Sequence, residues 1–137
     1  MTRGDLQTIA DIRIGEAQSL FAAGLFDGAY YLAGYSVECA LKACIARLTN
    51  QYDFPDKEFA QACYTHAIEK LVRAAGLVVQ RDGDAPPGSD LADNWSVVKD
   101  WTESSRYHRN NEQNAKALIE AITHAASGVL PWIKARW

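Results

Sequence analysis

The sequence lacks any long hydrophobic run, since nowhere do about 18 consecutive apolar residues occur. The N-terminal segment MTRGDLQTIADIRIGEAQ is interrupted by charges every few residues, unlike the apolar core of a signal peptide. Basic residues are not in excess either, because 14 Lys and Arg face 17 Asp and Glu. This balance argues against a wholly basic nucleic-acid binder, although it leaves room for a local positive patch. We therefore expect a cytoplasmic protein that does not associate with a membrane.

Cysteine is scarce, and its count of three is odd. Cys39, Cys44 and Cys63 all fall within helical patterns, which is typical of reduced thiols that serve as small hydrophobic residues. Cys39 and Cys44 point about 140° apart on a helix, so they cannot converge on one metal ion. We therefore expect reduced thiols, no zinc site and no cofactor.

Strand-like alternation is also missing, apart from the brief run Leu77-Val78-Val79. Helical spacing of apolar residues is present along most of the chain instead. With 137 residues, 48% of them hydrophobic, the chain can bury a core of its own. The sequence thus predicts an all-α protein with a single domain over residues 1–137.

Apolar spacing and capping signals indicate where the helices lie. The first should end at Gly24, the second should begin at Asp27 as N-cap, and the third should begin at Thr65. The predicted helices span residues 5–24, 27–48, 65–76, 90–101 and 111–137. The first two are joined by so short a turn that they should lie antiparallel.

The remaining segments are predicted from their turn residues. Residues 51–64 should form a loop, with room for one helical turn, that packs on the bundle through Phe54 and Phe59. Residues 80–90 are rich in Gly, Pro and Asp, and are expected to form an exposed, mobile loop. Pro131 should kink the last helix. Beyond the kink, Ile133 and Trp137 either form a partner surface or are buried against the same chain.

The predicted helix at residues 27–48 has two differently composed faces. Its apolar face, which should build the core, consists of Tyr30, Ala33, Val37, Ala40, Leu41, Cys44 and Leu48. Tyr31, Tyr35, Glu38 and Lys42 line up nearly opposite. Glu38 and Lys42 alone read as a surface ion pair, which contributes about 0.3 to 0.5 kcal/mol. Beside two phenols, however, these groups favour a ligand site or a subunit interface.

The densest polar cluster of the chain consists of four adjacent residues: Arg106, Tyr107, His108 and Arg109. A guanidinium can bind phosphate or carboxylate in a bidentate way, and an imidazole can take part in acid–base chemistry. Alternatively, Arg106 pairs with a carboxylate such as Glu38 and ties the last helices to the first. His66 could contact the same cluster or form a hydrogen bond across the bundle.

Taken together, these segments resemble a bacterial HEPN domain over roughly residues 10 to 135. The resemblance is carried by DGAYYLAGYSVECALKACI, by THAIEKLVRAAG, and by WTESSRY followed by an Ala-rich helix that ends in PWIK. The matching positions are Tyr30, Tyr31, Val37, Glu38, Leu41, Lys42 and Ala43 in the second helix, His66 before the third, and Arg106 and Tyr107 before the last.

The resemblance implies an antiparallel up-and-down bundle of about five helices that usually forms a homodimer, with a polar groove at or near the interface. HEPN proteins occur as partners of minimal nucleotidyltransferases in toxin–antitoxin or defence pairs, as ribonucleases, and as proposed nucleotide-binding modules. Our leading hypothesis is a non-catalytic module that binds a nucleotide, RNA or a nucleotidyltransferase partner. The expected groove residues are Tyr31, Tyr35, Glu38, Lys42, His66, Arg106, Tyr107 and Arg109.

The alternative is a metal-independent endoribonuclease that uses Arg106 and His108. Ribonucleases of the HEPN family carry an arginine that is followed, four to six residues later, by a histidine, and both act on one RNA phosphate. No arginine of this chain has a histidine at that spacing, since only Tyr107 separates Arg106 from His108. In the enzyme hypothesis, His66 or His108 would supply the imidazole in the folded dimer.

Overall fold

The computed structural model describes residues 1–49, 54 and 56–137, and its regular structure is entirely helical. The prediction of an all-α protein is confirmed, but the expected number of about five helices is wrong. Within the described residues there are eight α-helices and one 3-10 helix: α1 (Arg3–Ala22), α2 (Phe26–Leu48), α3 (Lys57–Cys63), α4 (Ile68–Ala74), α5 (Val78–Asp84), α6 (Asp90–Lys99), η1 (Glu103–Tyr107), α7 (Glu112–Thr123) and α8 (Val129–Lys134). None of the helices that the model describes is both long and apolar enough to cross a membrane.

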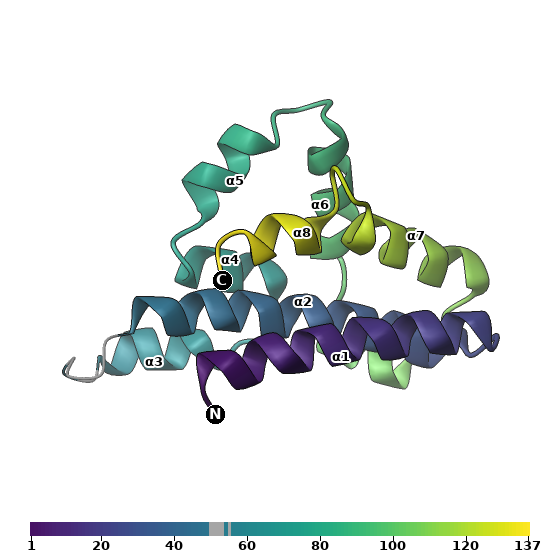
Figure 1. Ribbon diagram of the computed structural model, residues 1–137, viewed down its shortest axis with the longest axis horizontal. Coiled ribbons are helices and arrows are strands. Elements are labelled where there is room, and N and C mark those ends of the chain that lie inside the picture. The colour runs from purple at the N-terminus through teal and green to yellow at the C-terminus, as the bar shows by residue number, and fades with distance from the viewer. Residues whose placement is uncertain (50–53, 55) are drawn as a thin grey trace.

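The two long helices α1 and α2 form an antiparallel pair (Figure 1). A capping box between Thr2 and Asp5 starts α1, and Gly24, with a positive φ of 78°, follows its end. The N-cap of α2 is Leu25 and not Asp27, so it lies two residues earlier than predicted. Asp27 instead accepts hydrogen bonds from Arg109 and from the backbone N–H of Asn110.

Helix α2 is the central element, because α1, α4, η1, α7 and α8 all pack against it. Its predicted apolar face is buried, except that Tyr30 is only partly buried and Leu48 at the end of the helix is exposed. The Ser36 hydroxyl donates a hydrogen bond of 2.7 Å to the Ala10 carbonyl and thereby links α2 to α1. Gly34 allows the buried indole of Trp101 to lie directly on the backbone of α2, where a Cβ atom would overlap it. This close contact brings the chain into η1 alongside α2.

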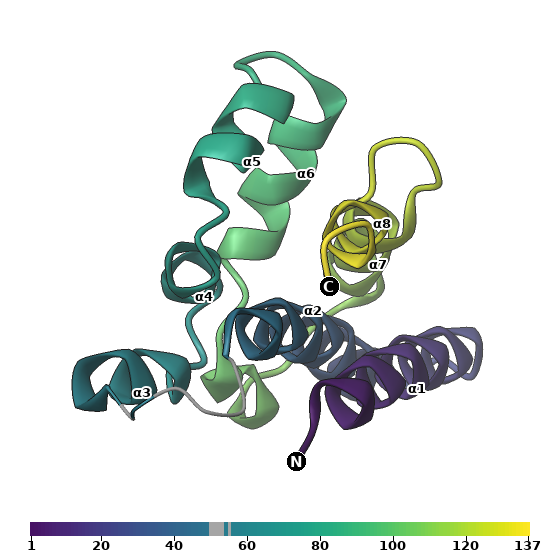
Figure 2. The ribbon, with the colours of Figure 1, turned by 60° about the vertical axis from the view of Figure 1, so that its left-hand side comes forward.

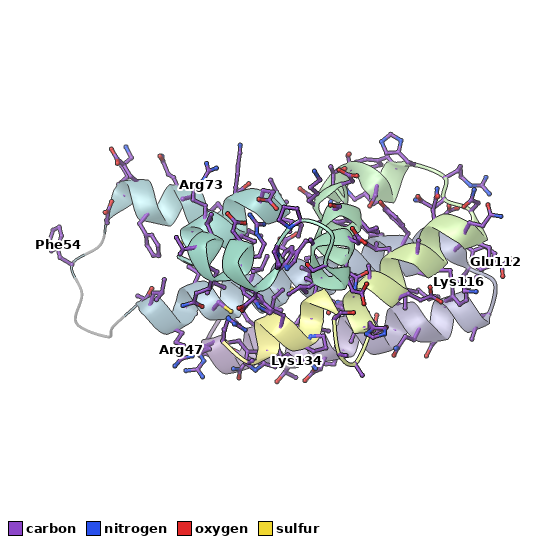
Figure 3. The ribbon with its side chains drawn as sticks, turned by 90° about the horizontal axis from the view of Figure 1, so that it is seen from above. Arg47, Phe54, Arg73, Glu112, Lys116 and Lys134 are labelled. Carbon is purple, nitrogen blue, oxygen red and sulfur yellow. The ribbon has the colours of Figure 1, made fainter. Side chains whose placement is uncertain are left out.

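The segment between α2 and α4 differs from its prediction in two respects. Phe54 does not pack on the bundle, since it is 94% exposed and points outward (Figure 3), whereas Phe59 does pack against the core. Thr65 is not a helix N-cap, because α4 begins only at Ile68. The Thr65 hydroxyl accepts from the backbone N–H of Ala67 instead. Residues 51–53 and 55 of the predicted loop lie outside the described residues.

The predicted mobile loop at residues 80–90 is wrong in its first half, and so is the strand-like reading of Leu77-Val78-Val79. Residues 78–84 form α5, which, together with α6, extends away from α1 and α2 (Figure 2). Tertiary contacts hold this short helix in place. The Arg81 guanidinium contacts Glu69 of α4, and Asp84 accepts hydrogen bonds from Trp132 (2.9 Å) and Arg136 (2.8 Å).

The predicted last helix is divided into α7 and α8. The His124 imidazole accepts from the backbone N–H groups of Ala126 and Ser127, and these bonds stabilise a turn between the two helices. Pro131 therefore falls in the first turn of α8, where its missing N–H breaks no helical hydrogen bond, and the break precedes it. Ile133 is buried in the core and is no partner surface, and Trp137 packs against the same chain.

Candidate functional site

The polar face of α2 meets η1, so two segments that are distant in sequence lie side by side. In Figure 2, η1 is the light-green turn beneath α2. Tyr31, Tyr35, Glu38 and Lys42 follow successive turns of α2. Along this face, the chain from Glu103 to Arg109 runs toward the N-terminal end of α2, because Glu103 lies near Glu38 through His66 whereas Arg109 pairs with Asp27.

Glu38 is buried, with an exposed fraction of 1%. Its Oε1 atom accepts a hydrogen bond of 2.9 Å from Lys42 and lies 2.8 Å from His66 Nδ1. Its Oε2 atom has no hydrogen-bond partner in the described residues. The ion pair expected at the surface is thus half-buried, because its carboxylate lies inside the protein while Lys42 stays partly exposed. The predicted pair between Glu38 and Arg106 is wrong, since Arg106 binds Glu103 instead.

Glu103 joins His66 and Arg106, which come from different segments. Its Oε2 atom lies 3.0 Å from His66 Nε2, and its Oε1 atom lies 3.0 Å from Arg106 Nη1. His66 therefore bridges two carboxylates, one at each ring nitrogen. Since an ionised carboxylate only accepts hydrogen bonds, the ring can donate to both only as an imidazolium. These contacts form a continuous chain of ionisable groups: Lys42, Glu38, His66, Glu103 and Arg106.

Aromatic rings flank this chain of ionisable groups. The rings of Tyr31 and Tyr35 stack with centroids 6.1 Å apart, and Tyr31 also lies against Trp101 at 6.1 Å. The guanidinium carbon of Arg106 lies 4.8 Å from the ring centroid of Tyr107, whose side chain is largely exposed. The pKa of Arg106 is raised, chiefly by hydrogen bonding to Tyr107, with smaller contributions from Tyr31 and Glu103. The guanidinium thus has phenols as neighbours and stays accessible.

Two members of the predicted groove are not part of this cluster. Arg109 lies at the N-terminal end of α2, where its Nε atom is 2.9 Å from Asp27 Oδ2. Its side chain is 96% exposed. His108 is exposed as well, and among the described residues its ring makes no hydrogen bond or ion pair. The structure therefore brings Arg106 together with His66 rather than with His108.

Sequence reasoning missed Glu103, which lies outside the predicted helices. The available signal was its position three residues before Arg106, a spacing at which opposite charges often pair. The side chains of Ser105 and Trp101 were missed as well. Both are buried and hold a polar atom without a partner in the described residues.

The thiols near the cluster are chemically quiet. Burial raises the pKa of Cys39 and of Cys44 to about 11, so both stay protonated near neutral pH. Burial also raises the pKa of Tyr35. In residues 1–49, 54 and 56–137, no three His, Cys, Asp or Glu side chains gather in a way that could hold a metal ion.

The fold and the site together define an all-α protein with a charged and aromatic cluster between its central helix and a 3-10 turn. Comparisons with protein-family models, with curated proteins and with solved structures find no match for the chain. The function is therefore argued from the cluster itself.

Proposed function

We propose that this chain is a HEPN-type module that binds the phosphate and the base of a nucleotide or of RNA. Its binding surface comprises Tyr31, Tyr35, His66, Arg106 and Tyr107, and Glu38 and Lys42 support this surface from behind. The observation that carries the proposal is the exposed guanidinium of Arg106, which lies on the exposed ring of Tyr107. A guanidinium binds phosphate through paired hydrogen bonds, and a phenol offers a flat face on which a base can stack.

The contacts of each residue suggest its role in ligand binding. Arg106 would bind the phosphate, and Tyr107 would stack on the adjacent base. Tyr31 and Tyr35 form the aromatic wall behind them, with ring planes only 11° apart. Glu38 and Lys42 are too deeply placed to contact a base, so they would hold His66 in position.

The endoribonuclease with Arg106 and His108 is a weaker candidate, because in the described residues the Arg106 guanidinium pairs with Glu103 and forms no hydrogen bond with His108. In that mechanism both groups would have to reach the same phosphate.

The test is binding of a fluorescein-labelled, single-stranded RNA to the purified protein, measured by fluorescence anisotropy. Arg106→Ala and Tyr107→Ala should each weaken binding about tenfold, because one charge-assisted contact or one base stack is lost. Arg73→Ala is the matched control, since Arg73 points outward from α4 (Figure 3) and should leave the affinity unchanged. Equal affinity of the Arg106→Ala variant and the wild type would contradict the proposal.

The same RNA is run on a denaturing gel after incubation with the protein. Intact RNA agrees with a binding module, whereas cleavage that is lost in Arg106→Ala and His108→Ala would favour the ribonuclease.

We further propose that the module works as a homodimer and pairs with a nucleotidyltransferase, as the resemblance to HEPN domains implies. Sedimentation at several protein concentrations tests the first part, and a monomer at every concentration would contradict it. Co-purification with the product of a neighbouring nucleotidyltransferase gene tests the second part.

A further inference from the structure

We propose that the Glu103 carboxylate occupies the position of a ligand phosphate and competes with it for His66 and Arg106. This inference rests on the proposed function and deepens it, because it names the two donors of the phosphate and the group that a phosphate must displace.

The geometry around Glu103 is that of an anion held by two donors. His66 Nε2 and Arg106 Nη1 approach its two oxygens, each at 3.0 Å. The donors come from different parts of the chain, since His66 precedes α4 whereas Arg106 belongs to η1. A phosphate offers more acceptor oxygens than a carboxylate and at least the same negative charge, so it can accept from both donors in the same place.

One of the two donors is fixed from inside the protein. Glu38 holds His66 by its Nδ1 atom at 2.8 Å, so that Nε2 is directed at Glu103. Glu38 itself is held by Lys42, and its side chain is only 2% exposed. The imidazole therefore keeps its direction when Glu103 moves away, and Glu38 is a positioning residue for the anion site.

Glu103 itself is placed so that it can leave. It is the first residue of the short helix η1, and the side chains on either side of it, Thr102 and Ser104, are exposed. Its own side chain is 29% exposed, and those of His66 and Arg106 are 45% and 44% exposed. Exposed ion pairs contribute little stability, so the exchange of this carboxylate for a phosphate costs little. Rotation of one side chain into water opens the site without uncovering the core.

The first experiment measures the affinity of inorganic phosphate and of the labelled RNA for the full chain. Glu103→Gln keeps the shape of the side chain but removes its charge, so both affinities should rise at least fivefold. His66→Ala, added to Glu103→Gln, should abolish the gain. Glu112→Gln is the matched control, because Glu112 lies in the first turn of α7 and makes no ion pair in the described part of the chain. Loss of a negative charge there should change either affinity less than twofold.

Equal gains in Glu103→Gln and Glu112→Gln would reveal a general charge effect and overturn the proposal. An unchanged affinity of Glu103→Gln would also overturn it, while the proposed function would stand as long as Arg106→Ala still weakens RNA binding. If no RNA binds to the wild type or to any variant, the proposed function fails as well.

A second measurement uses the wild-type protein and so does not depend on the folding of a variant. Saturating inorganic phosphate should shift the NMR signals of the His66 imidazole and of the Glu103 side chain, and leave those of the His124 imidazole unchanged. Unmoved signals of His66 and Glu103 at saturation would overturn the proposal.

Discussion

At the scale of single residues, Glu38 is the most costly side chain to bury, because a buried carboxylate needs partners to offset its lost hydration. Lys42 and His66 provide them at one oxygen, while the other oxygen has none in the described residues. The Glu38 side chain thus forms two stabilising contacts through one oxygen, but its hydrogen-bonding capacity is not fully used.

Glu38→Gln should lower the free energy of unfolding by about 1 to 3 kcal/mol, since charge-assisted hydrogen bonds to Lys42 and His66 are weakened. Urea unfolding followed by circular dichroism measures the change. Glu16→Gln is the control, because Glu16 pairs with Arg13 on the exposed side of α1 and should cost about 0.5 kcal/mol at most. Equal effects of the two changes would show that burial adds nothing to the Glu38 contacts.

Gly34 and Gly15 should respond in opposite ways to the same substitution. A Cβ atom at Gly34 overlaps the buried Trp101 indole, so Gly34→Ala should lower the free energy of unfolding by about 1 to 3 kcal/mol. A Cβ atom at Gly15 meets nothing within 4 Å, so Gly15→Ala should raise it by up to about 1 kcal/mol through helix propensity. Urea unfolding of both variants checks the two signs, and a stabilised Gly34→Ala protein would contradict the contact.

Part of the site could be predicted from single positions. Helical spacing is enough to place Tyr31, Tyr35, Glu38 and Lys42 along one face of α2. The partner of Arg106 could not be predicted, because a pair between segments depends on how the chain turns after Trp101. Glu38 is the partner that the sequence suggests, but Glu103, which is nearer to Arg106 in sequence, forms the pair.

At the scale of elements, α2 is unusual because its centre is buried on nearly every side, including its polar residues. Burial also affects the two cysteines of this helix, Cys39 and Cys44, because it raises the pKa of each thiol from the ordinary 9.0 to about 11.

This difference predicts how stability depends on pH. Between about pH 9 and pH 11 the unfolded chain loses the two thiol protons while the folded protein keeps them, so folding becomes less favourable as the pH rises. At about 1.4 kcal/mol per pKa unit, each thiol should contribute a loss of about 2 to 3 kcal/mol across this range. Urea midpoints at pH 8, 9, 10 and 11 measure the loss. The double variant Cys39→Ala and Cys44→Ala should show a smaller slope, and an unchanged slope would exclude these thiols as the cause.

The long helices could be predicted from the sequence, whereas the short helix α5 could not. Helices α1 and α2 are long enough for their apolar period to be read from the sequence, and Gly24 marks the end of α1. Helix α5 spans only seven residues, among them Gly83, and depends on contacts of Arg81 and Asp84 with distant segments. The end of α7 was missed for a similar reason, because the His124 side chain makes the turn.

At the scale of the whole molecule, a stack of cations and indoles connects α5 and α6 to α8. The Arg81 guanidinium lies 5.4 Å from the Trp95 ring centroid, and the Trp95 and Trp132 rings meet edge to face at 5.7 Å. The Arg136 guanidinium covers Trp132 at 3.8 Å and pairs with Asp84 of α5. Asp84 therefore ties the outlying helix to the end of the chain.

Asp84→Asn should loosen α5 without unfolding the rest of the protein. The charge that holds Arg136 is lost, so the backbone amides of α5 should exchange with solvent about tenfold faster or more, as expected for about 1.4 kcal/mol of local stability. Amides of α1 and α2 should keep their rates. Hydrogen exchange followed by NMR checks both, with Asp82→Asn as the control, since the Asp82 carboxylate pairs with Arg81 of the same helix and, within the described residues, with no other segment. Equal exchange in the two variants would contradict the role of Asp84.

Because the chain is synthesised from its N-terminus, α1 and α2 are the first helices that can pair. These helices are neighbours in sequence and make the most extensive contact of the fold, so their pairing needs no residue beyond Leu48 and can form early on the ribosome. The second half of the chain supplies His66 and Glu103, so the contacts of Glu38 with His66 and of His66 with Glu103 form only after α1 and α2 have been made.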